Sequence, residues 1–263
     1  MKITLRDYDV IVVNTSSGKD SQTLLDFVCT KASQEGVLDR VMCAHADLGR
    51  IEWPGATELA EQQAGLYGVP FWKMARPNGD MIQYAVARGK WPSPKQRWCT
   101  SDFKRDQINK LHTKLSKDLG SQDLRILNCM GMRAEESPAR AKLTVFQQNK
   151  RASTKTAKRR VDDWIAIKDW KLDDVWANIK ASGIPHHKAY DMGMPRLSCC
   201  FCIFAPKSAL LLAGQHNPEL LDAYVRAEKE MGHTFKADLS LAEIQDELKS
   251  MTKTTVTVPD WRM

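Results

Sequence analysis

The fold of this 263-residue chain is decided by the stretch Val10-Ile11-Val12-Val13-Asn14-Thr15-Ser16-Ser17-Gly18-Lys19-Asp20-Ser21. The apolar residues predict a β-strand, and the segment behind the turn, Gln22–Val28, predicts a helix. The turn offers backbone N–H groups, hydroxyls and a lysine, and the positive amino end of the following helix lies at the same place. These features predict a phosphate site, although the spacing is too short for the GxxxxGK[ST] loop.

A strand–helix alternation continues from this turn through about 170 residues. Buried parallel strands read as continuous apolar runs, and four of the five predicted strands do so. The expected strands are Asp9–Asn14, Arg40–Ala46, Val69–Met74, Leu124–Met130 and Trp164–Ile167. Helical composition separates them near Ser21–Glu35, Glu58–Tyr67 and Asp102–Leu119. Right-handed crossovers predict an α/β fold, a doubly wound, mostly parallel five-stranded sheet whose ligand site lies at the carboxyl ends of the strands.

After about residue 170 the pattern changes to short helices. We expect them at Asp173–Ala181, Lys207–Ala213 and Pro218–Glu230, with a cysteine-bearing loop before the second. The sequence therefore predicts two parts: residues 1–168 as the nucleotide-binding α/β domain, and residues 169–263 as a C-terminal helical, cysteine-bearing extension packed on it.

Polar, glycine-bearing turns follow two further predicted strands, at His45–Arg50 and at Gly131–Ser137. The carboxyl ends of parallel strands meet at one edge of the sheet, so these turns and the first one are expected to form one site. His45 fits a buried, hydrogen-bonded histidine and is left out of catalysis.

Four segments together resemble the sulfonucleotide (PAPS) reductase-like branch of the PP-loop ATP pyrophosphatases. They are the SxGKDS turn, Arg97-Trp98-Cys99-Thr100 with Lys104 behind it, Gly131-x-Arg133-x-x-Glu136-Ser137-x-x-Arg140, and the stretch Trp170–Cys202. The resemblance spans residues 9 to 205 and implies an adenine nucleotide α-hydrolase-like fold that binds ATP and Mg²⁺.

The resemblance also implies which residues form the nucleotide site. The expected contacts are Ser16, Ser17, Gly18, Lys19, Asp20, Ser21, Ala46, Asp47, Gly131 and Arg133. Catalysis is assigned to Lys19, Asp20 and Arg133, with Asp20 positioning Mg²⁺ through water. Two alternatives stay open: Ser17 or Asp20 could be only a helix cap beside a solvated lysine, and Arg133 could form a structural ion pair with Glu136.

The seven cysteines fall into two groups. Cys29, Cys43 and Cys129 lie in apolar elements and are expected to behave as small hydrophobic residues. The loop-like contexts hold Cys99, Cys199, Cys200 and Cys202, including a CxxC pair. Four thiolates are typical of a [4Fe–4S] cluster, our first interpretation; zinc and free redox thiols are the alternatives.

The net charge of +7 is concentrated in one place. Six cations and no acidic residue lie within Lys150–Arg160, so the remainder is close to neutral. A mobile basic loop that binds a nucleic acid, most simply DNA, fits this pattern, and a solvated loop is the alternative. The sequence lacks a long apolar stretch and a signal pattern, so we expect a cytoplasmic protein without membrane contact.

The absence of a cysteine after Cys202 separates two chemistries that the resemblance allows. Classical sulfonucleotide reductases use such a cysteine as the nucleophile. The resemblance then favours an enzyme, an ATP pyrophosphatase that adenylates a substrate for sulfur insertion, similar to the sulfurtransferase of DNA phosphorothioate-modification systems. It implies a sulfur donor such as a cysteine desulfurase, and is compatible with a homodimer. The alternatives are a PAPS or APS reductase using a partner's thiol, and a non-catalytic nucleotide- or nucleic-acid-binding subunit. The acceptor stays open.

Overall fold

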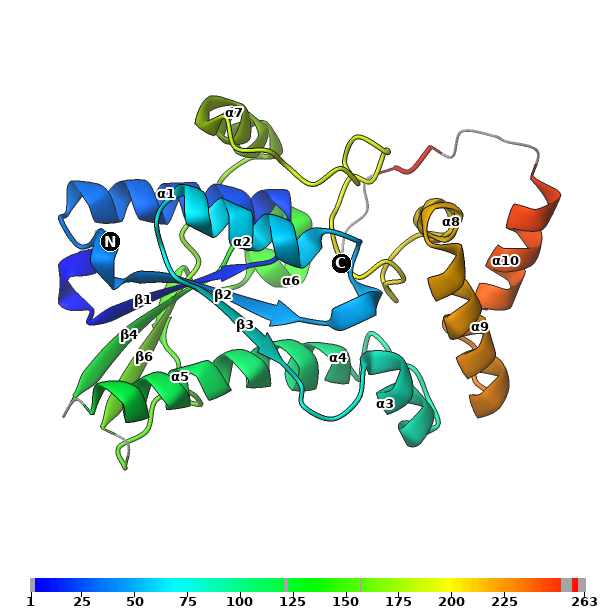
Figure 1. The fold of residues 1–263 in the computed structure, drawn as a ribbon, viewed down its shortest axis with the longest axis horizontal. Helices are drawn as coiled ribbons and strands as arrows, with labels where there is room; N and C mark the ends of the chain where they lie inside the picture. The colour runs from blue at the N-terminus through cyan, green and yellow to red at the C-terminus, as the bar shows by residue number, and fades with distance from the viewer. Residues whose placement is uncertain (1–2, 121–122, 157, 252–256, 260–263) are drawn as a thin grey trace. The chain divides into compact units, whose positions relative to one another are not determined.

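The computed structural model describes residues 3–120, 123–156, 158–251 and 257–259 (Figure 1). The chain forms two compact units, each built from three segments. The first comprises Met1–Ala46, Gly55–Met74 and Asp106–His187, and the second Asp47–Pro54, Ala75–Arg105 and Lys188–Met263. The chain thus passes between the units several times, whereas the predicted division into residues 1–168 and 169–263 cuts it once; that division stays a prediction.

The first unit is organised by a six-stranded sheet in the order β3-β2-β1-β4-β6-β5. The strands are β1 (Val10–Thr15), β2 (Val41–Asp47), β3 (Phe71–Ala75), β4 (Leu124–Cys129), β5 (Phe146–Gln148) and β6 (Arg159–Trp164). β1 is parallel to β2 and β4, and β4 is parallel to β6, while β5 is antiparallel to β6. The predicted α/β class and mostly parallel sheet are confirmed, with one strand more than expected.

Helices cover both faces of this sheet (Figure 1). The helices of the unit are α1 (Lys19–Gln34), α2 (Ala56–Leu66), α5 (Asp106–Leu119), α6 (Pro138–Ala141) and α7 (Leu172–Ser182). Ile11 and Val13 of β1 join the core under α1, while Val10 and Val12 join the core under α5. Because successive side chains of a strand point to opposite faces, this division explains why the first four residues of β1 are all apolar. Cys29, Cys43 and Cys129 are buried, as predicted.

The expected strand Trp164–Ile167 is wrong. The strand is β6, Arg159–Trp164, and its sequence Arg-Arg-Val-Asp-Asp-Trp is mostly charged. Asp162 is nevertheless fully buried because Tyr8 donates a hydrogen bond to it and Arg160 pairs with it. A search for apolar runs misses this strand because its charged residues are buried with partners from the folded structure.

The second unit is helical. Its helices are α3 (Met81–Arg88), α4 (Trp98–Thr100), a π-helix (Ser101–Arg105), α8 (Lys207–His216), α9 (Pro218–Met231) and α10 (Leu241–Ser250). The expected helices at Lys207–Ala213 and Pro218–Glu230 are confirmed, which agrees with a helical, cysteine-bearing extension. None of the helices that the structure describes is both long enough and apolar enough to cross a bilayer.

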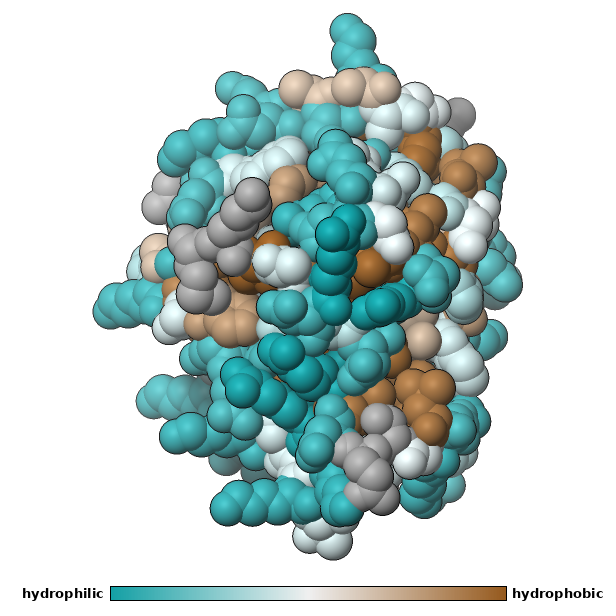
Figure 2. All heavy atoms as spheres, turned by 90° about the vertical axis from the view of Figure 1, so that its left-hand side faces the viewer, coloured by the Kyte–Doolittle hydropathy of each residue, from teal (hydrophilic) through white to brown (hydrophobic). Residues whose placement is uncertain are grey.

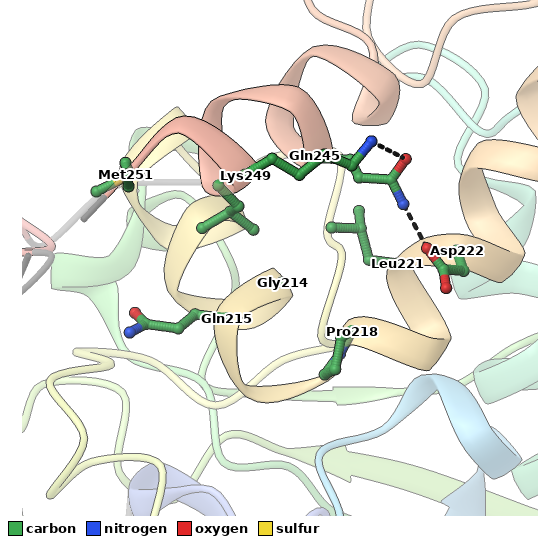
Figure 3. A pocket seen from close by; sticks show the side chains of 9 residues that line it. Gly214, Gln215, Pro218, Leu221, Asp222, Gln245, Lys249 and Met251 are labelled. Carbon is green, nitrogen blue, oxygen red and sulfur yellow. Dashed lines mark hydrogen bonds between the residues drawn. The ribbon is translucent and has the colours of Figure 1, made fainter. Parts of the chain in front are cut away.

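Close packing holds α8, α9 and α10 together. A Cβ on Gly214 of α8 would lie 2.8 Å from Leu248 Cδ1 and 2.9 Å from Leu221 Cδ2, so the absence of a side chain there lets the helices approach. Figure 3 shows the small hollow, of about 380 Å³, that opens beside this contact.

Candidate functional site

The phosphate loop lies at the switch point of the sheet. The chain runs from β1 outward through β2 and β3, and then returns to place β4 on the other side of β1. Ligands of open α/β sheets bind at the carboxyl ends of the strands where the order reverses in this way. Residues 16–18 occupy that position, between the end of β1 and the start of α1.

Hydroxyl groups hold the loop in shape. Ser21 Oγ accepts a hydrogen bond from Ser16 N at 3.1 Å and donates one to Gly18 O at 2.9 Å. Ser17 Oγ donates to Ser16 O at 2.7 Å, and Ser17 is fully buried with a φ of 53°. The left-handed conformation of a non-glycine residue is uncommon, and the three serines together stabilise it.

The amino end of α1 carries no side-chain cap. Gly18 is the N-cap residue, and no side chain accepts a hydrogen bond there. The first backbone N–H groups of a helix have no partner within the helix, so this end is suited to an anion. The alternative in which Ser17 or Asp20 serves as the helix cap is therefore wrong.

Lys19 is not a solvated lysine. Its side chain is only 4% exposed, and its Nζ lies 3.7 Å from Asp20 Oδ2. An amine buried in the first turn of α1 supplies positive charge at the same place as the N–H groups at the start of the helix. The structure therefore brings together the positive groups that a polyphosphate requires.

Arg133 connects the loop to the carboxyl end of β4. Its Nε donates to Asp20 Oδ1 at 2.5 Å, and its Nη1 donates to Glu135 Oε2 at 2.9 Å. Desolvation lowers the pKa of Arg133, but Asp20 and the neighbouring glutamates raise it by more, so the guanidinium stays charged. Arg133 is only 4% exposed, so it is a buried link between β4 and α1.

Glu136 contacts the backbone of Arg133, whereas the predicted alternative was an ion pair between their side chains. Glu136 Oε2 accepts from the backbone N of Arg133 at 2.8 Å, and its carboxylate pairs with Arg140. The guanidinium of Arg133 is thereby left to Asp20 and Glu135. Arg133 thus has a structural role, and the same contact keeps it at the loop.

Gly131 lies against the backbone of the loop. A Cβ at this position would lie 2.8 Å from Asp20 O and 3.1 Å from Ser21 Cα. Glycine is therefore needed for the close approach of β4 to the first turn of α1.

Ala46 and Asp47 are placed in different units. Ala46 follows His45, which pairs in register with Thr15, so it lies at the same sheet edge as the loop. His45 Nδ1 contacts Thr15 O at 3.0 Å and the ring is buried, as predicted. Asp47 belongs to the second unit, where its Oδ1 accepts from Gly49 N at 2.7 Å.

Three of the four candidate metal ligands form one electrostatic cluster in the second unit. Besides desolvation, Cys202 raises the pKa of Cys99, and Cys202 and Cys99 both raise the pKa of Cys199. Desolvation raises the pKa of Cys199 to about 12, although Lys104 lowers it. Desolvation also raises the pKa of Cys99. A metal must therefore displace protons to bind here.

Cys200 differs from the other three. Its side chain is 1% exposed and belongs to the hydrophobic core, while the other three thiols are half-buried at the edge of that core. Its backbone N donates to Ile51 O at 2.9 Å, and Cys199 forms a bridge with Glu52. These contacts fix the loop and direct Cys200 into the core.

The spacing of the thiols distinguishes between metals. All four cysteines lie in described residues, and no three of their sulfur atoms come within 4.8 Å of one another. A tetrahedral zinc site with Zn–S bonds of about 2.3 Å requires sulfur atoms about 3.8 Å apart. The four thiols are therefore not arranged as a tetrahedral zinc site requires.

Lys104 is the residue of this cluster that sequence reasoning left outside the site. Desolvation lowers its pKa, but Cys199, Cys202 and Cys99 in their thiolate form, together with Glu52, raise it by more. It lies in the π-helix that follows Cys99, an uncommon geometry that is frequent at functional sites. The sequence feature that could have indicated a role for Lys104 is its position five residues after Cys99.

The basic segment is held by hydrogen bonds rather than being a free loop. Thr154 and Arg159 exchange two backbone hydrogen bonds, of 2.9 and 3.0 Å. Arg159 is 9% exposed, and its guanidinium donates to Ala152 O and to Ser116 Oγ. The end of the segment is part of the sheet, because Arg159 and Arg160 are the first residues of β6; the mobility of the segment and its binding of a nucleic acid stay predictions.

Comparisons with known proteins agree with this architecture. The model of the phosphoadenosine phosphosulfate reductase domain matches residues 10–205. An uncharacterized 37.8 kDa protein encoded in the gpa 5' region of Escherichia phage 186 is 30% identical over 139 residues. The match covers 52% of this chain and 39% of that protein, so it spans about two-fifths of the relative's length.

Two solved structures are similar in fold. FMN adenylyltransferase of Candida glabrata, in complex with FAD and inorganic pyrophosphate, has a TM-score of 0.53 at 12% identity, covering 98% of this chain and 74% of that one. Phosphoadenylyl-sulfate (PAPS) reductase of Candida auris, a phosphate complex, has a TM-score of 0.47 at 16% identity, covering 74% and 84%. The first likeness supports the fold alone, and the second adds no argument. The family match over three-quarters of the sequence, on a sheet with the SSGKDS turn at its switch point, shows that the chain belongs to the phosphoadenosine phosphosulfate reductase domain family.

Proposed function

We propose that this protein cleaves ATP between the α- and β-phosphates and transfers the adenylyl group to a nucleic-acid substrate, so that sulfur can replace the activated oxygen. The observation that carries the proposal is the amino end of α1, which has no side-chain cap and lies beside the buried Lys19. Backbone N–H groups, a helix dipole and an amine converge there on the place of a polyphosphate.

The proposed reaction is an adenylyl transfer. An acceptor oxygen attacks the α-phosphorus, a new P–O bond forms, and the bond to the β-phosphate breaks, so pyrophosphate leaves. Lys19 and the N–H groups of α1 stabilise the charge that develops on the leaving group. Arg133 fixes Asp20, which would position Mg²⁺ through water. Bound Mg²⁺ supplies further neutralisation of the phosphate charge.

Sulfur insertion is the proposed second step. A sulfur nucleophile, delivered by a cysteine desulfurase or another donor, attacks the activated centre and the adenylated oxygen leaves as AMP. Cys99, Cys199 and Cys202 would hold a [4Fe–4S] cluster, with Cys200 as the proposed fourth ligand. Such a cluster supplies sulfur or electron handling when bound. A DNA phosphorothioation-type sulfurtransferase in the cytoplasm, as a monomer or homodimer, is the specific form of this proposal.

A sulfonucleotide reductase is the second candidate, because the matching family model describes that domain. It would bind PAPS or APS at the same loop and take its thiol from a partner. A third candidate is a subunit that binds ATP without turning it over. The three differ in their products: AMP and pyrophosphate, sulfite, or none.

The test is product analysis of purified protein in two incubations. ATP, Mg²⁺ and duplex DNA with sulfide as the sulfur nucleophile should yield AMP and pyrophosphate, whereas PAPS with a dithiol should yield no sulfite. Lys19→Ala should abolish the products while the protein stays folded. Lys31→Ala is the matched control, because Lys31 lies in the last turn of the same helix, away from the loop, where it pairs with Glu35. ADP with phosphate would refute the proposal, and sulfite would replace it with the reductase.

A further inference from the structure

A second positively charged hollow lies in the first unit, away from the phosphate loop. It has a volume of about 790 Å³. Its lining residues are Asp123, Arg125, Gln148, Lys150, Ser153, Thr154, Lys155, Lys158, Arg159 and Arg160. Six of these ten are cations and one is an acid, which is far more positive than the remainder of the chain.

The hollow lies at the amino ends of the parallel strands, whereas the nucleotide loop lies at their carboxyl ends. Asp123, Arg125 and Lys158–Arg160 lie at or just before the starts of the parallel strands β4 and β6. The phosphate loop follows the carboxyl end of β1, which is parallel to β4. A six-residue strand is about 20 Å long, so the two sites are separated by about that distance.

Not all six cations are available to a ligand. Arg160 pairs with Asp162, Arg125 lies over the ring of Tyr8 with 5.0 Å to its centroid, and Arg159 is buried in hydrogen bonds. The three lysines of the hollow have no carboxylate within 4.0 Å among the residues that the structure describes. They are Lys150, Lys155 and Lys158.

A short hairpin presents two of these lysines. Thr154 and Arg159 exchange backbone hydrogen bonds, and Lys158 N donates to Lys155 O at 3.1 Å. Lys158 has a φ of 45°, so the turn takes a left-handed conformation that side chains rarely adopt. The side of Figure 1 on which β4 and β6 begin faces the viewer in Figure 2, where hydrophilic side chains predominate.

We infer that this hollow docks the phosphate backbone of a nucleic acid, at a distance from the site of adenylation. The inference rests on the proposed function for the identity of the acceptor. Spread, unpaired lysines match a line of phosphates, and none of the lining residues is aromatic, so base stacking is not supported. Binding should therefore be independent of sequence. A nucleic acid held here must extend about 20 Å along the first unit to reach the phosphate loop.

The experiment measures the binding of a 30-base-pair duplex as a function of salt. Replacing Lys150, Lys155 and Lys158 with glutamine removes three phosphate contacts. The slope of log K against log salt should become shallower by about 2.7. Between 50 and 200 mM salt, the fold-decrease in the affinity of the variant should therefore be about 40 times smaller than that of wild type. Two duplexes of unrelated sequence should give the same result.

A control triple changes the same charge elsewhere. Three exposed lysines outside the hollow serve for this: Lys95, Lys180 and Lys229. Their replacement with glutamine should change the slope of log K against log salt by less than about 0.9, the value expected for one phosphate contact. Equal slopes for the two triple variants would overturn the inference. So would binding to phosphatidylserine vesicles together with no binding to the duplex.

The proposed function and this inference fail in different ways. If ATP yields ADP while the lysine triple still flattens the slope, the docking site stands and adenylation falls. If ATP yields AMP and pyrophosphate while the slope is unchanged, adenylation stands and the docking site falls. Lys19→Ala protein should bind the duplex as wild type does, because its change lies at the other edge of the sheet.

Discussion

Replacing Gly131 with alanine should disturb the phosphate loop through the backbone. The new Cβ would lie 2.8 Å from Asp20 O, 3.0 Å from Asp20 C and 3.1 Å from Ser21 Cα. These atoms belong to the first turn of α1, so no side-chain rotation relieves the clash, and the turn must move. Overpacking of this kind costs about 1–3 kcal/mol. We expect a loss of that size in the free energy of unfolding and a loss of ATP affinity of at least about tenfold, equivalent to about 1.4 kcal/mol.

Urea unfolding and calorimetric titration with a non-hydrolysable ATP analogue measure the two effects. Gly65→Ala is the matched control, because Gly65 lies in α2 and a Cβ there meets nothing within 4 Å. That control should keep ATP affinity and gain up to about 1 kcal/mol from helix propensity. A Gly131→Ala protein as stable and as tightly bound to the analogue as wild type would refute the packing argument.

The other predictions concern pH and iron. Burial and Arg159 lower the pKa of His112 from 6.5 to about 4, so the folded state keeps it neutral. Stability present above pH 6.5 should fall by up to about 3 kcal/mol as the pH drops to 4, because only the unfolded chain takes up the proton. His112→Leu should flatten this dependence in urea titrations, the exposed His216→Gln should not, and a decline that survives His112→Leu would contradict the assignment. Anaerobically purified protein should contain about four irons per chain. Iron should be lost on alanine substitution of Cys99, Cys199 or Cys202 and kept on substitution of the buried Cys129. Protein that contains one zinc ion and no iron would contradict the assignment of a cluster. Retained iron in Cys200→Ala would show that another group completes the cluster.

Much of the sheet was predictable because its central strands are buried on both faces. β1 begins with four apolar residues and β4 is apolar except for Arg125 and Asn128, and such patterns can be read without knowing which strands lie beside them. β6 was misplaced because its charged residues hide its burial: Tyr8, 154 residues away, donates a hydrogen bond to Asp162, and Arg160 forms an ion pair with it. The three-residue β5 has only polar glutamines after Phe146.

The site divides in the same way. The SSGKDS turn is local, so its residues could be named from the sequence. The pairing of Arg133 with Asp20, 113 residues apart, depends on β4 lying beside β1. The burial of Arg159 likewise depends on contacts with α5. A charge count alone placed Arg159 among the phosphate contacts, whereas the structure uses it to hold the hairpin.

Pyrophosphate exchange tests the central claim most directly. Protein is incubated with unlabelled ATP, Mg²⁺, duplex DNA and ³²P-pyrophosphate, and the label recovered in ATP is measured. Reversible adenylyl transfer predicts label in ATP with wild-type and Lys31→Ala protein and none with Lys19→Ala. Formation of ADP and phosphate, with no label entering ATP in any of the three proteins, would contradict cleavage between the α- and β-phosphates.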